Sequence, residues 1–363
     1  MSTLEVVHGP RFRSARARRR IHGERAAPRP IHAKAPLRVS FAGGGTDVPP
    51  FPAQEGGLVL SAAINRYAYG ALAPRSDGVI GVESLDLGLS VEHPSEDELV
   101  FDGRLDLVTA AIRKLGRGGF DLFLHSNAPP GSGLGSSSSL VVTMIGLLCE
   151  YHRLALTDYE IAELAYSVER EDLGIAGGLQ DQYAAAFGGF NLIEMDGEKV
   201  VVNPLRIPDD VICELEHNML LCYTGRTRQG DHIIDDQRAR FRAGEAGALE
   251  GLRMQKRLAL EMKDALLRRR LNDFGSLLGE AWEFKKRMSP RITTDFIDEA
   301  YTAALAAGAL GGKVTGAGGG GYMLFFCPFQ RKHRVAEALT RRGGVVAEFE
   351  FAPRGLATWS VDA

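Results

Sequence analysis

The pattern of apolar and polar positions changes period repeatedly along the chain. Apolar residues that alternate with polar ones, bounded by glycine or proline, predict strands at 36–42, 57–73, 119–125, 190–194, 199–202, 219–223, 311–315, 322–327 and 345–351. Apolar residues spaced three and four apart predict helices at 105–115, 136–150, 158–172, 179–187 and 331–342, and about three long ones within 246–307. Because strands and helices are mixed rather than strictly alternating, we expect an α+β fold and not a doubly wound parallel sheet.

The stretch Asn127–Glu150 joins a glycine-rich loop to a buried helix. Pro129 and Pro130 lack backbone donors, and the glycines that follow allow positive φ. The helix begins near Ser136, so its unpaired N–H groups and positive dipole end face outward and favour an anion, phosphate above all. Neither the Walker pattern nor the dinucleotide fingerprint fits, because no Lys follows the glycines and Ser136 replaces the third Gly. A flexible turn before a core helix is the alternative.

Two further glycine-rich corners, at 43–45 and 316–321, accompany the loop at 131–135. Glycine permits close backbone approach, so three such corners predict several segments that converge on one ligand. Three sharp turns without a common ligand would give the same pattern.

Asp181 and Arg38 are the leading candidates for chemistry. Asp181 falls in the first turn of a short helix, where the dipole favours a carboxylate able to accept a hydroxyl proton. Arg38 lies in an otherwise apolar strand, where a permanent charge requires an anionic partner. A helix-stabilising Asp and an outward-facing Arg are the alternatives.

Four more polar residues have both a functional and an ordinary interpretation. Asp47 follows a glycine corner and would accept sugar hydroxyls, or merely cap the turn. Glu169 lies at a charged helix end, where most acids are solvated. Arg226 and Arg228 follow a strand and would hold a second phosphate, although the sequence alone favours solvated loop arginines.

Charge and cysteine content narrow the class of protein. Residues 1–33 hold eight Arg and two Glu, a net charge of +6 within a chain of net charge −3. This tail has no helical or strand period, so we expect disorder; contact with nucleic acid or an acidic surface and a dispensable extension both stay open. The four cysteines show no zinc spacing, and no apolar run reaches membrane-spanning length. We therefore expect reduced thiols, no membrane partner and a cytoplasmic protein.

Three motifs occur in an order that resembles the GHMP kinases. They are Ala35–Asp47 (APLRVSFAGGGTD), Pro129–Ser138 (PPGSGLGSSS) and Lys313–Gly321 (KVTGAGGGG). The resemblance implies an N-terminal ribosomal protein S5 domain 2-like lobe at 34–205 and a C-terminal ferredoxin-like lobe at 206–363. It places the active site in the cleft between them, after the tail at 1–33.

The resemblance also implies roles for individual residues, with ATP and Mg²⁺ as cofactors. Asp181 matches the catalytic aspartate, Arg38 its basic partner, and Ser137 and Glu169 the Mg²⁺ ligands, although nearby Glu171 leaves that alignment open. The nucleotide would bind Pro130, Gly131, Ser132, Gly133, Leu134, Gly135, Ser136, Ser137 and Ser138. The acceptor would bind Gly44, Gly45, Thr46, Asp47, Gly178, Arg226, Arg228, Gly318 and Gly319.

Within the family, the sugar-kinase branch whose acceptor is a heptose 7-phosphate is the most similar, on stretches that include 41–48, 64–69, 172–191 and 202–207. Such an enzyme phosphorylates the anomeric hydroxyl, and its 1,7-bisphosphate product lies on the route to GDP-heptose. The acceptor's own phosphate would need a second cationic pocket, for which Arg226, Arg228, Lys285 and Lys286 are candidates. A fucokinase, a mannose 1-kinase, a non-catalytic sensor of ATP and sugar, and a homo-oligomer stay open, whereas nucleic acid is not the expected partner.

Overall fold

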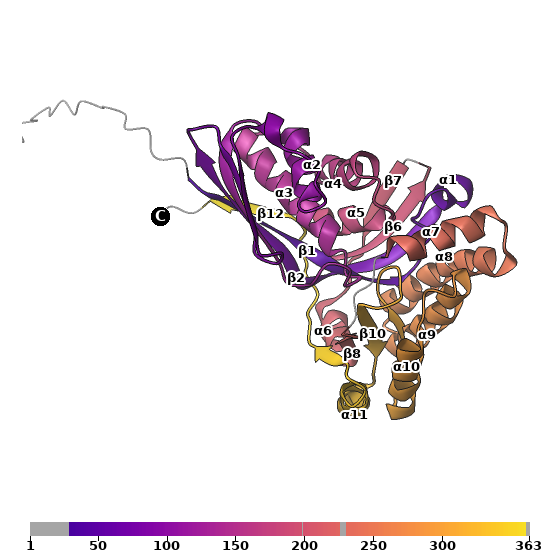
Figure 1. The fold of residues 1–363 in the computed structure, drawn as a ribbon. Helices are drawn as coiled ribbons and strands as arrows, with labels where there is room; N and C mark the ends of the chain where they lie inside the picture. Colours follow the sequence, from indigo (N-terminus) through magenta and orange to yellow (C-terminus); the bar gives the residue numbers. More distant parts are fainter. Residues whose placement is uncertain (1–28, 198, 226–229, 361–363) are drawn as a thin grey trace, which may run out of the picture.

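The computed structural model describes residues 29–197, 199–225 and 230–360, which form two sheets and the helices around them (Figure 1). The first sheet has the order β12-β1-β2-β5-β3-β4, and β6 and β7 extend it from the first half of β2. Its strands are β1 (Ile31–Ala42), β2 (Gly57–Arg75), β3 (Ile80–Ser84), β4 (Leu89–His93), β5 (Gly119–Ser126), β6 (Phe190–Asp196), β7 (Lys199–Pro204) and β12 (Ala357–Ser360).

The second sheet lies on the other side of the molecule and is wholly antiparallel. Its order is β11-β8-β10-β9, with β8 (Met219–Tyr223), β9 (Gly311–Val314), β10 (Tyr322–Phe326) and β11 (Val345–Ala347). The central strand β10 is buried along its whole length, as its continuous apolar sequence predicts. Two sheets of mixed and antiparallel strands with segregated helices confirm the expected α+β class.

The described helical segments fall into two groups. The first covers one face of the first sheet: α2 (Asp106–Leu115), α3 (Ser136–His152), α4 (Asp158–Tyr166), η2 (Ser167–Asp172) and α5 (Gln180–Phe187). The remaining segments are α1 (Phe51–Glu55), η1 (Glu96–Glu98), α6 (Asp209–Asn218), α7 (Asp231–Arg242), α8 (Ala246–Leu267), α9 (Leu271–Met288), α10 (Asp295–Ala307) and α11 (Phe329–Thr340).

The two lobes share a hydrophobic core, and this core fixes the cleft between them. Leu37, Val39 and Phe41 of β1 are fully buried with Phe274 of α9, and the Phe41 and Phe274 rings meet edge to face with their centroids 5.1 Å apart. Each such side chain contributes about 1.5–3 kcal/mol when buried. The end of β1 is therefore held against the C-terminal lobe.

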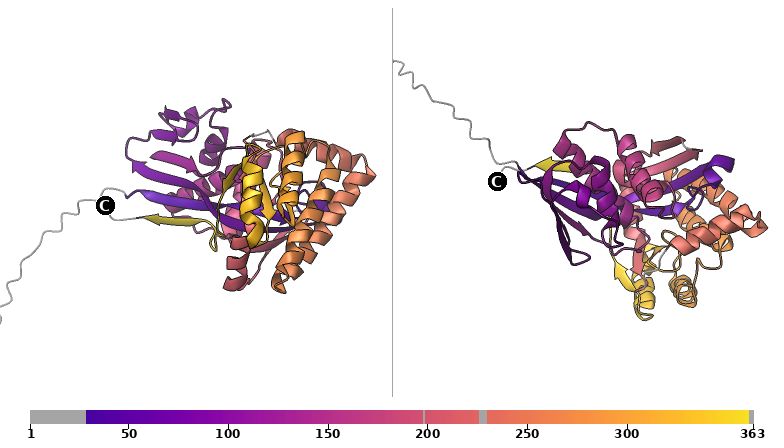
Figure 2. Two further views of the ribbon diagram at one scale, coloured as in Figure 1. Left: turned by 90° about the horizontal axis from the view of Figure 1, so that it is seen from below. Right: turned by 45° about the horizontal axis from the view of Figure 1, so that its top comes forward.

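Several elements differ from the predicted ones. The first strand begins at Ile31, so residues 31–33 belong to β1 and not to the tail. The last strand, β12, leaves the C-terminal lobe and pairs with β1, as the views in Figure 2 show. Helix α1 begins directly after Pro50 and was not among the predicted helices. Proline is tolerated in the first turn of a helix, so the prolines here do not prevent it. The sequence pattern did not reveal α6 or α7, and β11 ends at Ala347 instead of 351.

The predicted helix at 158–172 changes its winding partway. It is α-helical to Tyr166 and then takes one π-helical stretch, η2. Such π-turns are rare and are found frequently at functional sites. Here the wider turn includes Glu169, which is only 1% exposed despite lying in the charged run Glu169–Asp172.

Candidate active site

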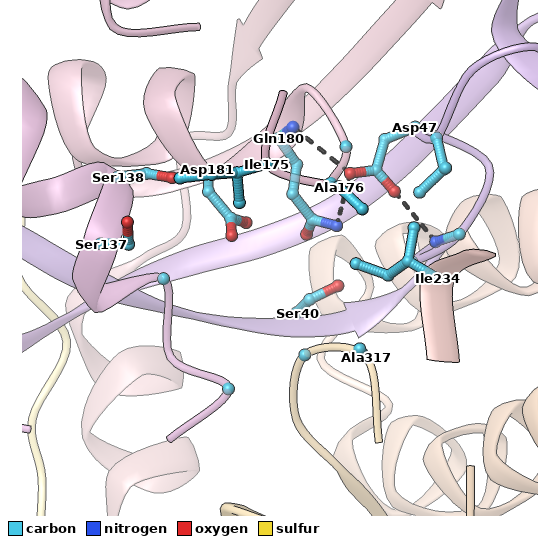
Figure 3. A pocket seen from close by; sticks show the side chains of 18 of the residues that line it. Ser40, Asp47, Ser137, Ser138, Ile175, Ala176, Gln180, Asp181, Ile234 and Ala317 are labelled. Carbon is cyan, nitrogen blue, oxygen red and sulfur yellow. Dashed lines mark hydrogen bonds between the residues drawn. The ribbon is translucent and has the colours of Figure 1, made fainter. Parts of the chain in front are cut away.

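The three glycine corners lie together around one pocket of about 210 Å³ (Figure 3). A Cβ on Gly133 would come within 2.6 Å of the Thr315 carbonyl oxygen, and one on Gly316 within 2.6 Å of Gly133 Cα. Gly44 and Gly45 line the same pocket from the end of β1. The convergence that the sequence predicted is therefore present, and it depends on backbones that a side chain would separate.

The loop before α3 presents backbone N–H groups to this pocket. Gly131, Gly133 and Gly135 all have positive φ, of 72°, 80° and 76°. Within the described part of the chain, the amides of Gly133, Leu134 and Gly135 donate to no backbone carbonyl. Because α3 starts at Ser136, its dipole adds positive potential at the same point. The loop is built to hold phosphate oxygens.

Arg38 and Asp181 form a nearly buried ion pair beside the loop. Asp181 Oδ1 accepts from Arg38 Nε at 2.8 Å and lies 2.6 Å from the second guanidinium nitrogen, and Arg38 also donates to the Gly133 carbonyl at 2.7 Å. The side chains are 4% and 21% exposed. Asp181 Oδ2 has no hydrogen-bond partner among the described residues, so one carboxylate oxygen faces the pocket.

Glu169 accepts hydrogen bonds from three side chains, two of which lie in the first turn of α3. Ser137 donates to its Oε1 at 2.7 Å, while Ser138 and Gln182 donate to its Oε2 at 2.6 and 2.5 Å. Glu171, the other residue that the family alignment left open, accepts from Ser167 and is exposed. Of these two acids, Glu169 lines the pocket and Glu171 does not.

Asp47 is a buried carboxylate on the opposite wall (Figure 3). Gly45 N donates to its Oδ1 at 2.9 Å, and the Gln180 amide donates to its Oδ2 at 2.9 Å. Burial, together with the nearby Asp181 charge, raises the pKa of Asp47, and the two hydrogen bonds oppose that rise. A carboxylate held in this way is suited to accept hydroxyl groups of a bound sugar.

Gly178 makes room for Asp47, since a Cβ there would overlap Asp47 Oδ2. We expect Gly178→Ala to displace that carboxylate and raise the KM for the acceptor by about 10-fold or more, with a smaller effect on the KM for ATP. Gly247→Ala is a matched control, because its added Cβ would meet only one carbonyl oxygen, at 3.6 Å. Steady-state kinetics of both variants, with each substrate varied in turn, check this expectation. Equal acceptor KM values for the two variants would contradict it.

Some residues expected to contact ligand have other positions. The Thr46 hydroxyl donates to the Gly43 carbonyl and accepts from Leu58 N, so Thr46 holds the corner and does not line the pocket. Gly318 and Gly319 pack against Ile292, whose carbonyl accepts from Gly319 N at 2.7 Å. Instead Gly316 and Ala317 face the pocket. Arg226 and Arg228 lie outside the described residues.

The sequence pattern missed several residues that line the pocket. Gln180 positions Asp47, Arg170 lies next to Glu169, and Gln237 reaches the pocket from α7. Lys285 had been only one of four candidates for a second phosphate site, yet it is buried and lines the pocket. The sequence does mark Lys285, because it is a cation on the apolar face of a helix, at helical spacing from Leu278, Ala281 and Trp282.

Comparison with known proteins identifies the class to which this fold and site belong. Residues 106–189 match the model of the GHMP kinases N terminal domain, and residues 262–345 match that of the GHMP kinases C terminal domain. The chain is 39% identical, over 91% of its length, to a curated member. It therefore belongs to the GHMP kinase family, as the three motifs indicated.

That curated relative is the D-glycero-alpha-D-manno-heptose 7-phosphate kinase of Campylobacter jejuni, of which 99% is covered. A solved structure described as a D-glycero-D-manno-heptose 1-phosphate kinase from Bacteroides thetaiotaomicron is 37% identical, with a TM-score of 0.77 over 92% of this chain and 100% of that one. The L-fucokinase/L-fucose-1-P guanylyltransferase of Bacteroides fragilis is 29% identical over 81% of this chain and 34% of its own. None of the described helices is long and apolar enough to cross a membrane.

Proposed function

We propose that the chain is an ATP-dependent kinase that phosphorylates the anomeric hydroxyl of D-glycero-α-D-manno-heptose 7-phosphate. The observation that carries this proposal is the Arg38–Asp181 pair, which lies between the phosphate loop and Asp47. One side of the pocket suits the phosphates of a nucleotide and the other suits a polyhydroxyl acceptor. The 39% identity to a heptose 7-phosphate kinase supports the choice of acceptor.

The residues also fit Mg²⁺, which the family uses with ATP. Ser137 and Glu169 supply hard oxygen atoms 2.7 Å apart at the mouth of the phosphate loop. The described residues contain no cluster of three or more His, Cys, Asp or Glu that would hold a metal alone. That sparse set suits Mg²⁺, which binds through one or two carboxylates, water and substrate phosphates. When bound, the ion would neutralise charge on the nucleotide phosphates.

The chain's own residues would orient the two substrates and accept the proton of the reacting hydroxyl. Loop amides and the α3 dipole hold the phosphate chain, while Asp47 fixes the sugar through its hydroxyls. Arg38 keeps Asp181 in place through Oδ1, so Oδ2 stays directed at the anomeric hydroxyl. Asp181 Oδ2 accepts that proton as the sugar oxygen attacks the γ-phosphorus and ADP leaves.

The test is coupled ADP release with Mg-ATP against a panel of acceptors. The panel is D-glycero-D-manno-heptose 7-phosphate, D-glycero-D-manno-heptose 1-phosphate, sedoheptulose 7-phosphate, mannose, fucose and galactose. We expect turnover of the 7-phosphate with a kcat/KM at least 10²-fold above mannose, fucose and galactose, because a buried site that pairs with a charge rejects analogues that lack it. The two other sugar phosphates are expected to react more slowly as well, because they do not present a free anomeric hydroxyl and a phosphate in the same arrangement.

The other outcomes are equally informative. Preferential turnover of fucose or mannose would keep the family and replace the acceptor. Turnover of the 1-phosphate alone would move the reacting hydroxyl away from the anomeric carbon. If nothing is phosphorylated although ATP binds, the chain is a sensor and the proposal is wrong.

A further inference from the structure

Lys285 is a buried cation in the pocket to which the transfer chemistry above gives no role. It lies on α9, its side chain is buried, and it lines the pocket together with Arg38 and Asp47. Its ammonium donates to the Gly316 carbonyl, and no carboxylate in the described chain lies within 4 Å of it. An ammonium group forms up to three hydrogen bonds, so donors remain for a ligand.

The surroundings of Lys285 are short of negative charge. The Arg38 charge disfavours the charged form of Lys285, and the Asp47 carboxylate favours it. Burial is the largest cause, and the pKa of Lys285 falls to about 8. Burial, Lys285 and Arg38 in turn lower the pKa of Lys313. Asp181 is already paired with Arg38, and the Lys313 ammonium donates to the Phe41 carbonyl at 3.0 Å, its one hydrogen bond within the described residues. Because an unpaired buried charge is costly, this arrangement requires an anion when the pocket is filled.

We propose that Lys285 binds a phosphoryl oxygen of a substrate inside the pocket. This inference rests on the proposed function and assigns a cation to its substrates. Two phosphoryl groups of the substrates would supply such an oxygen. One is the phosphate that the acceptor already carries, on the side of Asp47. The other is the group in transfer, since Gly316, whose carbonyl binds Lys285, packs on Gly133 of the phosphate loop.

The neighbouring Lys286 provides the contrast. Its ammonium lies 2.9 Å from Glu283 and 5.8 Å from the centre of the Trp282 ring, and it does not line the pocket. A purely structural role for Lys285 would be to tie α9 to the glycine corner through Gly316. The structural role predicts that replacing Lys285 lowers only the melting temperature, whereas the binding role predicts a change in Kd or kcat.

The experiment compares Lys285→Met with Lys286→Met. Calorimetry without ATP gives the Kd for heptose 7-phosphate and for the unphosphorylated heptose, and steady-state kinetics give kcat. A charge-assisted hydrogen bond is worth roughly 10- to 10²-fold. If Lys285 binds the acceptor's phosphate, Lys285→Met raises the Kd for heptose 7-phosphate by that factor and leaves the Kd for the free heptose unchanged. If it binds the transferring group, both Kd values stay and kcat falls by that factor with either acceptor.

Equal Kd and kcat values in the two variants would overturn the proposal, as would a loss confined to melting temperature. Lys285→Gln keeps a donor for Gly316 and removes the charge, so it replaces Lys285→Met if that variant does not fold. If the wild-type protein neither binds nor phosphorylates heptose 7-phosphate, the proposed acceptor is wrong. The role of Lys285 is then tested by the binding of inorganic pyrophosphate. Weaker pyrophosphate binding in Lys285→Met than in Lys286→Met then supports the assignment, and equal binding refutes it.

Discussion

Asp181→Asn is expected to lower kcat by roughly 10²-fold or more, the usual contribution of a positioned general base. The substitution preserves shape but removes the negative charge that pairs with Arg38 across 2.6–2.8 Å. It also removes the free oxygen that would accept the anomeric proton. The KM for ATP is expected to change much less, because the amides of the phosphate loop are untouched. Steady-state kinetics with Mg-ATP and heptose 7-phosphate provide the measurement.

The simpler interpretation of Asp181 is an acid that stabilises the first turn of α5. Asp209→Asn is the control, because Asp209 occupies the first turn of α6 and is exposed. Each change weakens the N-terminus of its helix by about 0.3–1 kcal/mol, and only Asp181→Asn is expected to lower kcat by roughly 10²-fold or more. A wild-type rate for Asp181→Asn would show that the phosphoryl group is transferred without a base at this position.

Glu169→Gln is expected to lower kcat by roughly 10²- to 10³-fold, the loss seen when one preorganised electrostatic group is removed. It is also expected to raise the Mg²⁺ concentration needed for half-maximal rate. Glu169 accepts three side-chain hydrogen bonds, from Ser137, Ser138 and Gln182. The glutamine amide accepts at one oxygen only, so its NH₂ group would face a donor and leave it unsatisfied. A Mg²⁺ titration at saturating ATP measures the effect.

Glu171→Gln is the matched control for this charge run. Glu171 accepts from Ser167 at 2.6 Å on the exposed side of η2, and it does not line the pocket. Its variant is expected to keep both the rate and the Mg²⁺ dependence of the wild-type protein. If Glu171→Gln shows the larger defect, the metal site has been assigned to the wrong acid.

The local motifs were readable from the sequence because each depends on residues close together in the chain. Proline and glycine forced a loop at 129–135, and the apolar face from Leu140 onward required a buried helix after it. The order of three motifs gave the family and the two-lobed fold, and both are confirmed. Arg38 was marked by a charge within an apolar strand, and its partner is an Asp 143 residues away.

What the sequence did not reveal depends on contacts between distant segments. The return of β12 to β1 is one such contact, because four residues carry too little pattern to specify a partner. The π-helical turn that buries Glu169 has no signal in the charged run around it. The hydrogen bond from Gln180 to Asp47 joins residues 133 positions apart. Lys285 was visible as a cation on an apolar face, but only the packing of α9 shows that the face meets the pocket.

Phosphorus NMR of the product tests the central claim most directly. Heptose 7-phosphate is incubated with Mg-ATP and the wild-type chain, and the spectrum is followed as ADP accumulates. The account predicts one new anomeric phosphate signal, coupled to the proton on C1, that grows in step with ADP while the C7 phosphate signal is retained. A new phosphate on any other carbon, or ADP formation without a phosphorylated sugar, would contradict it.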